Sequence, residues 1–179
     1  MARQVAFLRA INVGGHVVTM NRLRVLFEEI GLRGVETLIA SGNVMFDAPR
    51  GARGSLERRI ERHLKDALGY EVATFVRTAG DLARILACEP FADSGGKAPN
   101  LYVGMLAAQP TDEATARLTA LSCETDRFHV EGLEIYWGRH GGFSDSRFTG
   151  ATLERAVGMP VTVRGINTIR RLSARMPGS

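Results

Sequence analysis

Two stretches of the chain carry the same order of sequence patterns. In each, an apolar run typical of a strand is followed by a segment with apolar residues at helical spacing, two further strand-like runs, a second helical segment and a last strand-like run. This β-α-β-β-α-β order is that of the ferredoxin-like unit. The sequence therefore predicts an α+β protein made of two tandem ferredoxin-like (α/β plait) units with accessory helices, each unit with a mixed sheet.

The boundaries of these units follow from a break between the two patterns. Residues 1–78 form the first predicted unit, and residues 100–179 form the second, which includes a C-terminal helix. Between them, Thr78 and Asp81 are spaced as the capping box of a short helix. A stretch rich in Pro, Gly and Ser then runs from residue 89 to residue 100. Residues 79–99 are therefore predicted to be a connecting helix and a linker.

Residue types at the ends of the periodic segments predict where helices begin and end. Thr19, Ser55 and Thr111 stand in N-cap position before helical patterns, and Gly31 and Gly69 end two of them. Strands are expected at residues 3–11, 35–40, 44–48, 71–77, 101–107, 127–130, 133–137 and 161–163. The first strand of each unit is apolar on both faces, which predicts burial on both faces.

The composition is that of a soluble globular protein, with 45% hydrophobic and 23% charged residues. The chain has no apolar run near the roughly 20 residues of a membrane span, and its N-terminus does not resemble a signal peptide. Cys88 and Cys123 do not have the spacing of a metal or redox motif. These features predict a cytoplasmic protein with no membrane partner, no cofactor and no metal site. The chain shows no pattern that predicts an oligomeric state.

Positive charge is concentrated at one place in the sequence. The net charge is +4, and of the 23 Lys and Arg residues only Lys65 and Lys97 are lysines. Near the C-terminus, four arginines occur with no acidic residue among them: Arg164, Arg170, Arg171 and Arg175. Their spacing predicts that Arg164, Arg171 and Arg175 lie near one helix face. One hypothesis is therefore nucleic-acid binding through a basic C-terminal helix.

A second hypothesis comes from the first strand, which contains Arg9 and then breaks into Asn12-Val13-Gly14-Gly15. In a split β-α-β arrangement the first two strands are parallel, so their C-terminal ends lie at one edge of the sheet. The loop after the first strand, the start of the first helix and the turn Ser41-Gly42-Asn43 should therefore meet there. Glycine backbone, amide side chains and the N–H groups of a helix start suit a phosphate or a carboxylate. The alternative is that the same residues form a structural corner.

Two segments of this edge are similar to the pattern of a known family. LRAINVGG and ASGNVMF resemble the LRGINVGG and SGNVVF hallmarks of the family catalogued as domain of unknown function 1697, and VTVRGINTIRRL stands where that family typically reads TxRNWNTxxKL. The resemblance implies tandem ferredoxin-like domains of bacterial type and no established activity. The chain departs from the pattern at Ala10, where Gly is usual, and at Gly165 and Ile166, where Asn and Trp are usual. The matching positions are Arg9, Asn12, Gly14, Gly15, Ser41, Gly42, Asn43, Thr162, Arg164, Asn167 and Thr168.

The leading hypothesis is a cytosolic protein that binds a small anionic or nucleotide-like ligand at the edge formed by Arg9, Asn12 and Ser41–Asn43. In this hypothesis Arg9 supplies the charge, Asn12 and Asn43 orient the ligand, and the glycines allow a close approach of the backbone. Nucleic-acid binding and an enzyme that uses the same edge remain open as alternatives, and no catalytic residue is identified. The candidate ligand-binding residues are Arg9, Asn12, Gly14, Gly15, Ser41, Gly42, Asn43, Arg164, Asn167 and Thr168.

Overall fold

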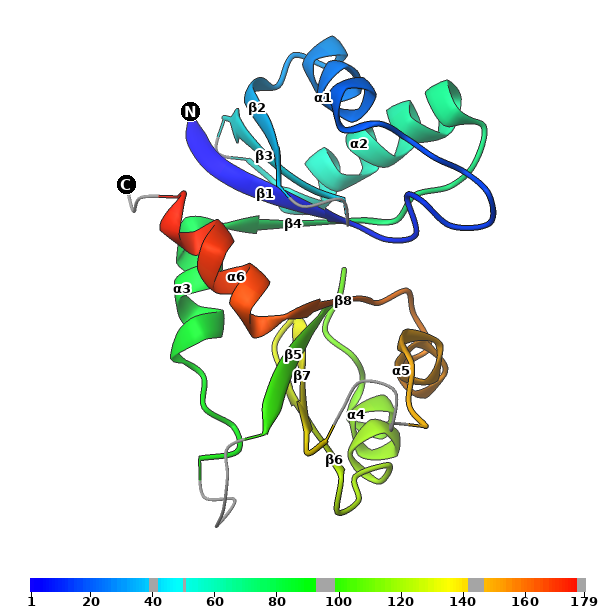
Figure 1. Ribbon diagram of the computed structural model, residues 1–179, viewed down its shortest axis with the longest axis vertical. Coiled ribbons are helices and arrows are strands. Elements are labelled where there is room, and N and C mark those ends of the chain that lie inside the picture. Colours follow the sequence, from blue (N-terminus) through cyan, green and yellow to red (C-terminus); the bar gives the residue numbers. More distant parts are fainter. Residues whose placement is uncertain (39–41, 50, 93–98, 142–146, 177–179) are drawn as a thin grey trace. The chain divides into compact units, whose positions relative to one another are not determined.

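The computed structural model describes residues 1–38, 42–49, 51–92, 99–141 and 147–176. The chain divides into two compact units. The first consists of Met1–Ala83 together with Arg171–Ser179, and the second consists of Arg84–Arg170. Each unit contains one four-stranded antiparallel sheet with helices packed on it (Figure 1). The predicted α+β class is thereby confirmed.

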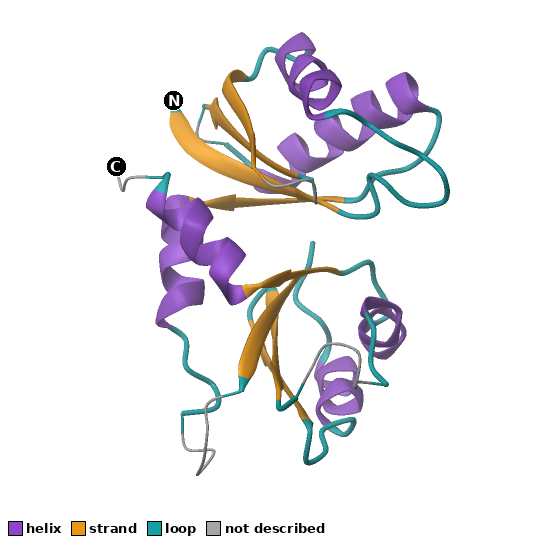
Figure 2. Ribbon diagram, in the orientation of Figure 1, coloured by secondary structure: helices purple, strands orange, loops and turns teal. Residues whose placement is uncertain are grey.

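In the first unit, β1 forms the centre of the sheet together with β3. The strands lie in the order β2-β3-β1-β4, and Val5 of β1 is paired with Met45 on one side and with Arg77 on the other. Helices α1 and α2 lie together on one face of this sheet (Figure 2). The elements are β1 (Ala2–Leu8), α1 (Met20–Glu29), β2 (Arg33–Leu38), β3 (Asn43–Ala48), α2 (Arg53–Leu68), β4 (Thr74–Thr78) and α3 (Ala79–Ala87).

The second unit repeats this arrangement. Its strands lie in the order β6-β7-β5-β8, and Val103 of β5 is paired with Tyr136 and with Arg164. The prediction of mixed sheets is wrong in both units, because β3 lies between the parallel strands β1 and β2, and β7 lies between β5 and β6, so that every paired neighbour is antiparallel. The elements are β5 (Asn100–Met105), α4 (Asp112–Thr119), β6 (Asp126–Glu131), β7 (Glu134–Arg139), α5 (Gly150–Val157), β8 (Thr162–Gly165) and α6 (Ile166–Ala174).

Most of the predicted helix signals act as expected. The Thr19 hydroxyl accepts a hydrogen bond from the Arg22 N–H (3.1 Å), and Thr111 caps α4 in the same way. The capping box before α3 is present, since the Asp81 N–H donates to the Thr78 hydroxyl (3.1 Å) and the Thr78 N–H donates to the Asp81 carboxylate (2.9 Å). The predicted cap at Ser55 is wrong.

Helix α2 begins two residues before Ser55, with Ala52 in N-cap position and no side-chain cap. Arg53, the first residue of the helix, forms an ion pair with Asp81 (2.8 Å), and this contact holds the additional turn. The strand predicted at residues 71–77 begins later, at Thr74. Residues 39–40 of the strand predicted at 35–40 lie outside the described residues.

Both faces of the two central strands are buried, as their two-sided apolar pattern predicts. On the helix-covered face of the first unit, Ala6, Leu8, Val44 and Phe46 belong to one hydrophobic core with α1 and α2. Alternate residues on the opposite face are buried as well: Val5, Phe7, Met45, Phe75, Val103, Met105 and Tyr136. Among the described residues, no helix has both the length and the apolar composition that a membrane span requires.

Carboxylates from the helices satisfy backbone N–H groups of the edge strands. The Val76 N–H of β4 donates to the Glu57 carboxylate of α2 (2.8 Å), and the Thr74 N–H donates to Glu61 one turn further along the helix (2.9 Å). In the second unit, the Val161 N–H beside β8 donates to Glu154 of α5 (2.9 Å). An edge strand leaves a row of unpaired N–H groups, so each of these glutamates closes an edge that would otherwise be open.

We expect the stability of the fold to depend on pH through Glu57. Burial raises the pKa of Glu57 above its ordinary value of 4.5, against the opposing effects of the Val76 N–H and of Arg77. A raised pKa means that the folded state binds a proton more readily than the unfolded state, so the stabilising contribution is fully present below the unfolded pKa and is lost as pH rises through the folded pKa. Urea unfolding should therefore show wild type losing stability relative to Glu57→Gln as pH rises above 4.5.

The control for this measurement is Glu28→Gln, because Glu28 is exposed on α1. Its difference from wild type should not follow the pH dependence seen with Glu57→Gln. A pH-independent difference between wild type and Glu57→Gln would contradict the assignment. Below pH 4.5, where the contribution of Glu57 is fully present, Glu57→Ala should cost about 1–3 kcal/mol, because it leaves the buried Val76 N–H without an acceptor.

Candidate functional site

The end of β1 and the start of β3 lie side by side, as the predicted edge requires. Phe7 is paired with Asn43, and the Leu8 N–H donates to the Gly42 carbonyl (2.8 Å). Gly42 has φ +74°, and a Cβ at this position would lie 2.9 Å from Ile11 Cγ2. Only glycine suits such a backbone conformation in so tight a space. Ser41, the remaining residue of the predicted turn, lies outside the described residues.

The loop between β1 and α1 is held by its own polar groups. The Asn12 side-chain oxygen accepts a hydrogen bond from the Val18 N–H (2.8 Å), which closes the loop. Gly14 and Gly15 have φ values of +68° and +84°, and a Cβ on either residue would meet no atom within 4 Å. These two glycines are therefore required for the backbone conformation and not for a close approach. Both are exposed, as is Asn12.

A contact from α2 supports this loop and could not be inferred from the sequence pattern. The Tyr70 hydroxyl, just after α2, donates to the Ile11 carbonyl (2.8 Å). The His16 ring stacks on the Tyr70 ring, with 4.1 Å between the ring centroids. Tyr70 lies 59 positions after Ile11 in the chain, so no local signal links the two residues. The loop is consequently preformed in the absence of a ligand.

A cavity of about 210 Å³ opens at this edge, beside the start of α1. Its polar lining comes from Asn12, Thr19, Thr37 and Asn43, and Gly42 also contributes. Its apolar lining comes from the loop and from α1, namely Ile11, Val17, Val18, Met20 and Leu23. The structure thus brings together three of the predicted site residues: Asn12, Gly42 and Asn43.

Arg9, Gly14 and Gly15, also predicted at this edge, are not part of the cavity lining. Arg9 is half-buried. Its backbone N–H donates to the Ala73 carbonyl (2.9 Å), which lies on the β4 side of β1 and not on the β3 side. Asn43 lines the cavity, but it is 1% exposed, and its amide donates to the Leu38 carbonyl (3.0 Å). Two N–H groups near the helix start have protein acceptors, because the Val18 N–H donates to Asn12 and the Arg22 N–H donates to Thr19. The edge is therefore more apolar than predicted.

Large apolar side chains that face solvent are concentrated around the cavity. Among the described residues, the exposed large hydrophobic side chains are Val13 (60%), Val17 (83%), Met20 (45%) and the N-terminal Met1. Val17 and Met20 both line the cavity, so they form an apolar and accessible mouth. Exposed apolar patches in soluble proteins mark sites of interaction. Sequence analysis did not single out these two residues as ligand contacts, since Val17 is a lone apolar residue in a loop and Met20 follows the ordinary apolar spacing of a helix.

One protein-family model matches most of the chain. The model of the family described as "Protein of unknown function (DUF1697)" matches residues 1–136. The chain belongs to this family. The match contains the whole edge and ends in β7. A comparison with curated protein sequences gives no match.

Among solved structures, the chain is similar to the conserved bacterial protein SP0830 from Streptococcus pneumoniae. The TM-score is 0.77, the sequence identity is 22%, and the likeness covers 99% of each chain. At this identity the likeness shows the fold alone. It extends beyond the residues matched by the DUF1697 model and includes the C-terminal part of the second unit.

One departure from the DUF1697 pattern has a clear backbone consequence. Ala10 stands where that pattern usually has Gly, and it is the one non-glycine residue with positive φ (+56°) in the described part of the chain. A Cβ in the left-handed region costs roughly 1–2 kcal/mol. The family residue is thus the one that this backbone favours.

We therefore expect Ala10→Gly to stabilise the protein. The relief of backbone strain should exceed the entropic cost of glycine in the unfolded chain, which leaves a gain of about 0.5–1 kcal/mol. Ala116→Gly, at an exposed position of α4, is the control and should lose about 1 kcal/mol. Equal losses in the two variants, measured by denaturant unfolding, would show that Ala10 is not strained.

The C-terminal candidates belong to the second unit and have structural partners there. Arg164 lies in β8 and is 9% exposed, and its guanidinium donates to the Thr162 hydroxyl (2.8 Å) and to the Val163 carbonyl (2.9 Å). Burial lowers the pKa of Arg164 to about 10. Asn167 is exposed and accepts a hydrogen bond from Arg170 (2.8 Å), and Thr168 is half-buried. The structure does not bring these residues together as one exposed polar site.

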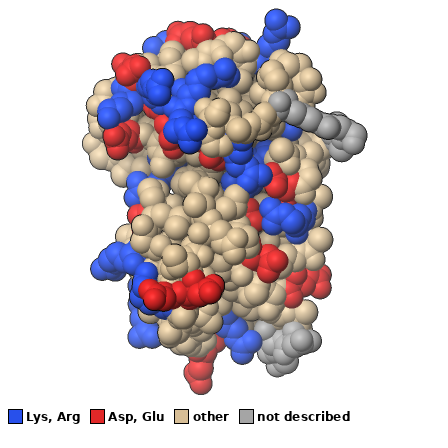
Figure 3. Space-filling view, turned by 180° about the vertical axis from the view of Figure 1, so that it is seen from behind, with Lys and Arg blue, Asp and Glu red and all other residues tan. Residues whose placement is uncertain are grey.

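The predicted basic helix face is wrong with respect to Arg164. That residue precedes α6 and is buried in the sheet, so it is not part of a helix surface. Arg175 is exposed and lies 3.8 Å from the Glu36 carboxylate. Over the face drawn in Figure 3, Lys and Arg side chains are interspersed with Asp and Glu side chains. A nucleic-acid site needs basic residues clustered on one face, and this arrangement does not support one.

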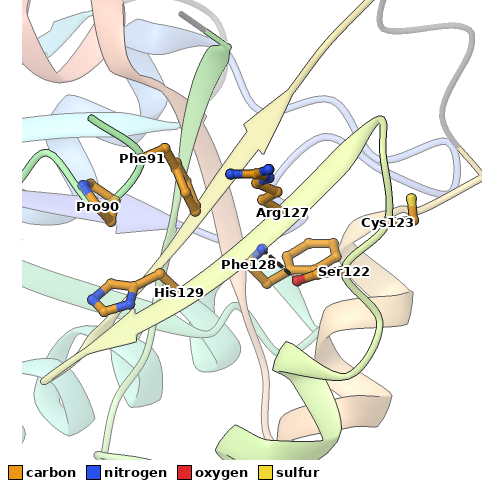
Figure 4. A pocket seen from close by; sticks show the side chains of 7 residues that line it. All are labelled: Pro90, Phe91, Ser122, Cys123, Arg127, Phe128 and His129. Carbon is orange, nitrogen blue, oxygen red and sulfur yellow. Dashed lines mark hydrogen bonds between the residues drawn. The ribbon is translucent and has the colours of Figure 1, made fainter. Parts of the chain in front are cut away.

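A shallow depression of about 420 Å³ lies on the second unit, along the edge strand β6 (Figure 4). Phe91, Arg127 and His129 line one part of it, and Ser122 and Cys123 line the other. The Ser122 hydroxyl accepts a hydrogen bond from the Phe128 N–H (3.1 Å), so this side chain has a structural role. A hydrogen bond with the Thr125 hydroxyl lowers the pKa of the Cys123 thiol. In the view of Figure 4, Cys123 lies far from His129, so the two do not form a nucleophile–base pair.

One buried hydroxyl in the described part of the chain lacks a well-formed hydrogen bond. The Tyr136 hydroxyl, on β7, is fully buried, and its neighbour is the Cys88 thiol, a weak hydrogen-bonding group that does not satisfy it geometrically. Burial raises the pKa of Tyr136, and the neighbouring Cys88 and Glu134 raise it further. Among the described residues, His, Cys, Asp and Glu side chains do not gather in threes in a way that could hold a metal ion.

We expect Tyr136→Phe to stabilise the protein by about 1 kcal/mol, because an unsatisfied buried hydroxyl carries a desolvation cost of about 1–3 kcal/mol. Tyr70→Phe makes the same chemical change but removes a hydrogen bond to Ile11, and it should cost about 1 kcal/mol. Thermal and denaturant unfolding of the two variants would test this contrast. A clear loss of stability in Tyr136→Phe would mean that its hydroxyl has a partner after all.

Proposed function

We propose that this member of the DUF1697 family is a cytoplasmic binding protein built from two tandem ferredoxin-like units. The strand orders β2-β3-β1-β4 and β6-β7-β5-β8, combined with a β-α-β-β-α-β element order, support the ferredoxin-like assignment of each unit. The two cysteines are free thiols, in keeping with a reducing compartment. In this proposal the binding site is the edge between the β1–α1 loop and the start of β3.

The observation that carries the proposal is the apolar mouth of the cavity. Val17 and Met20 line a preformed cavity and are 83% and 45% exposed. Burying such side chains against a ligand yields about 25 cal/mol per Å² of apolar surface. Because hydrogen bonds to Asn12 and Tyr70 already hold the loop, little ordering entropy opposes binding.

The dimensions of the cavity narrow the class of ligand. Sites for drug-sized ligands measure roughly 300–1,000 Å³, and this cavity, at about 210 Å³, holds only part of such a molecule. A nucleotide base with its sugar would not be enclosed. We therefore propose a small amphiphile that places an apolar tail among Val17, Met20 and Leu23 and keeps a negatively charged head outside. Arg9 lies outside the cavity lining, at the start of the same loop, and we propose that its guanidinium reaches the head group there.

Octanoate, octylammonium and octanol are matched probes for this proposal, because they share a tail and differ in the charge of the head. Isothermal titration calorimetry should show the wild type binding octanoate most tightly. Arg9→Ala should weaken the binding of octanoate by roughly 1.5–3 kcal/mol, the contribution of a charge-assisted hydrogen bond. The binding of octanol should not change. Val17→Ser should weaken the binding of all three probes, because it removes apolar surface from the mouth without adding a charge.

Two control variants separate the cavity from the surface around it. Arg33→Ala removes an exposed positive charge from β2 and should bind octanoate as the wild type does. Val13→Ser removes an exposed apolar side chain that does not line the cavity and should have little effect. If Arg9→Ala lowers the melting temperature without a binding defect, Arg9 is structural and the charged part of the proposal is wrong. If no probe binds the wild type, the proposal as a whole is wrong.

A further inference from the structure

The second unit contains a larger cavity, which is separate from the edge described above. It measures about 480 Å³ and lies among the end of α3, the segment after it, the start of β5 and α6. This volume is within the range of sites that enclose whole small molecules. Every described residue that lines it belongs to the second unit, so the cavity is treated as a site of that unit.

The walls of this cavity are largely apolar and fixed by packing. The apolar lining residues are Leu86, Pro90, Phe91, Pro99, Leu101 and Ile166. Phe91 is held against the sheet by close contact with Gly138 of β7, where a Cβ would lie 2.8 Å from the Phe91 ring. Glycine at this position therefore makes room for the aromatic wall.

Two residues of opposite charge line the same cavity. Arg170 of α6 is exposed, and in the described part of the chain its guanidinium donates one hydrogen bond, to Asn167 (2.8 Å). Glu89 has no side-chain hydrogen bond or ion pair to any described residue. In the described part of the chain, these two side chains do not form an ion pair with each other. A zwitterion would satisfy both groups, since its carboxylate matches the guanidinium and its ammonium matches the glutamate.

We propose that this cavity binds a free α-amino acid with a large apolar side chain. The apolar walls, with Phe91 among them, enclose the side chain. Arg170 takes the α-carboxylate, and Glu89 takes the α-ammonium. This site is distinct from the edge of the first unit and does not depend on the function proposed there.

Three ligands with one common ring system test each charge separately. Phenylalanine carries both charges, 3-phenylpropanoate lacks the ammonium, and 2-phenylethylamine lacks the carboxylate. By calorimetry, phenylalanine should bind the full-length wild type at least tenfold more tightly than either analogue. Glu89→Gln should lower its affinity to that of 3-phenylpropanoate, and Arg170→Gln should lower it to that of 2-phenylethylamine. Arg171→Gln, next to Arg170 and outside the lining, is the control and should bind as the wild type does.

The cysteines provide a second readout that locates the ligand. Cys88 lines this cavity, whereas Cys123 does not. Phenylalanine should therefore slow the alkylation of Cys88 by iodoacetamide and leave the alkylation of Cys123 unchanged, as followed by peptide mass spectrometry. Equal affinity for all three ligands, unaltered binding in both Glu89→Gln and Arg170→Gln, or an absence of binding in the wild type would each overturn the proposal.

Discussion

Burial of both faces of each sheet is the constraint that shapes this protein. Val5 and Ala6, adjacent in β1, point to opposite faces, and both are fully buried. A strand enclosed in this way cannot turn its polar backbone toward water, so its hydrogen bonds must come from neighbouring strands or from side chains. The central strands obtain them from the ladders, whereas the edge strands need another source. Glu57, Glu61 and Glu154 are that source at β4 and β8.

The same constraint accounts for a sequence pattern that occurs in both units. The last strand of each unit contains a Val-Arg pair, at Val76-Arg77 and at Val163-Arg164, and a helix follows within two residues. Both arginines are buried, and each donates to the carbonyl of the valine before it (2.9 Å). Their partners in the central strands, Val5 and Val103, are the same residue type at corresponding positions. This agreement in residue type and register indicates that the two units are structural repeats.

Much of the fold could be predicted because its signals are local. The caps at Thr19 and Thr111 and the terminal Gly69 act through hydrogen bonds and backbone angles within one helical turn, and the structure contains all three. The prediction at Ser55 failed because a distant partner, Asp81, stabilises Arg53 and lengthens the helix. The prediction of mixed sheets was wrong for a similar reason, since the direction of strand pairing depends on which strand lies between two others. That arrangement depends on contacts between residues far apart in the chain.

The residues of the candidate site also divide into those that local sequence signals predict and those that they do not. Asn12, Gly42 and Asn43 were predictable from sequence, yet each has a structural role, since Asn12 closes the loop, Gly42 fits where a Cβ would collide, and Asn43 holds the Leu38 carbonyl. Their presence in the family pattern is explained by the backbone alone. No backbone requirement of this kind accounts for Val17 and Met20, which expose apolar surface at a cost in solvation. A loop that presents apolar side chains beside a cavity gains from them only when something covers them, so the binding that we propose at this edge rests on Val17 and Met20.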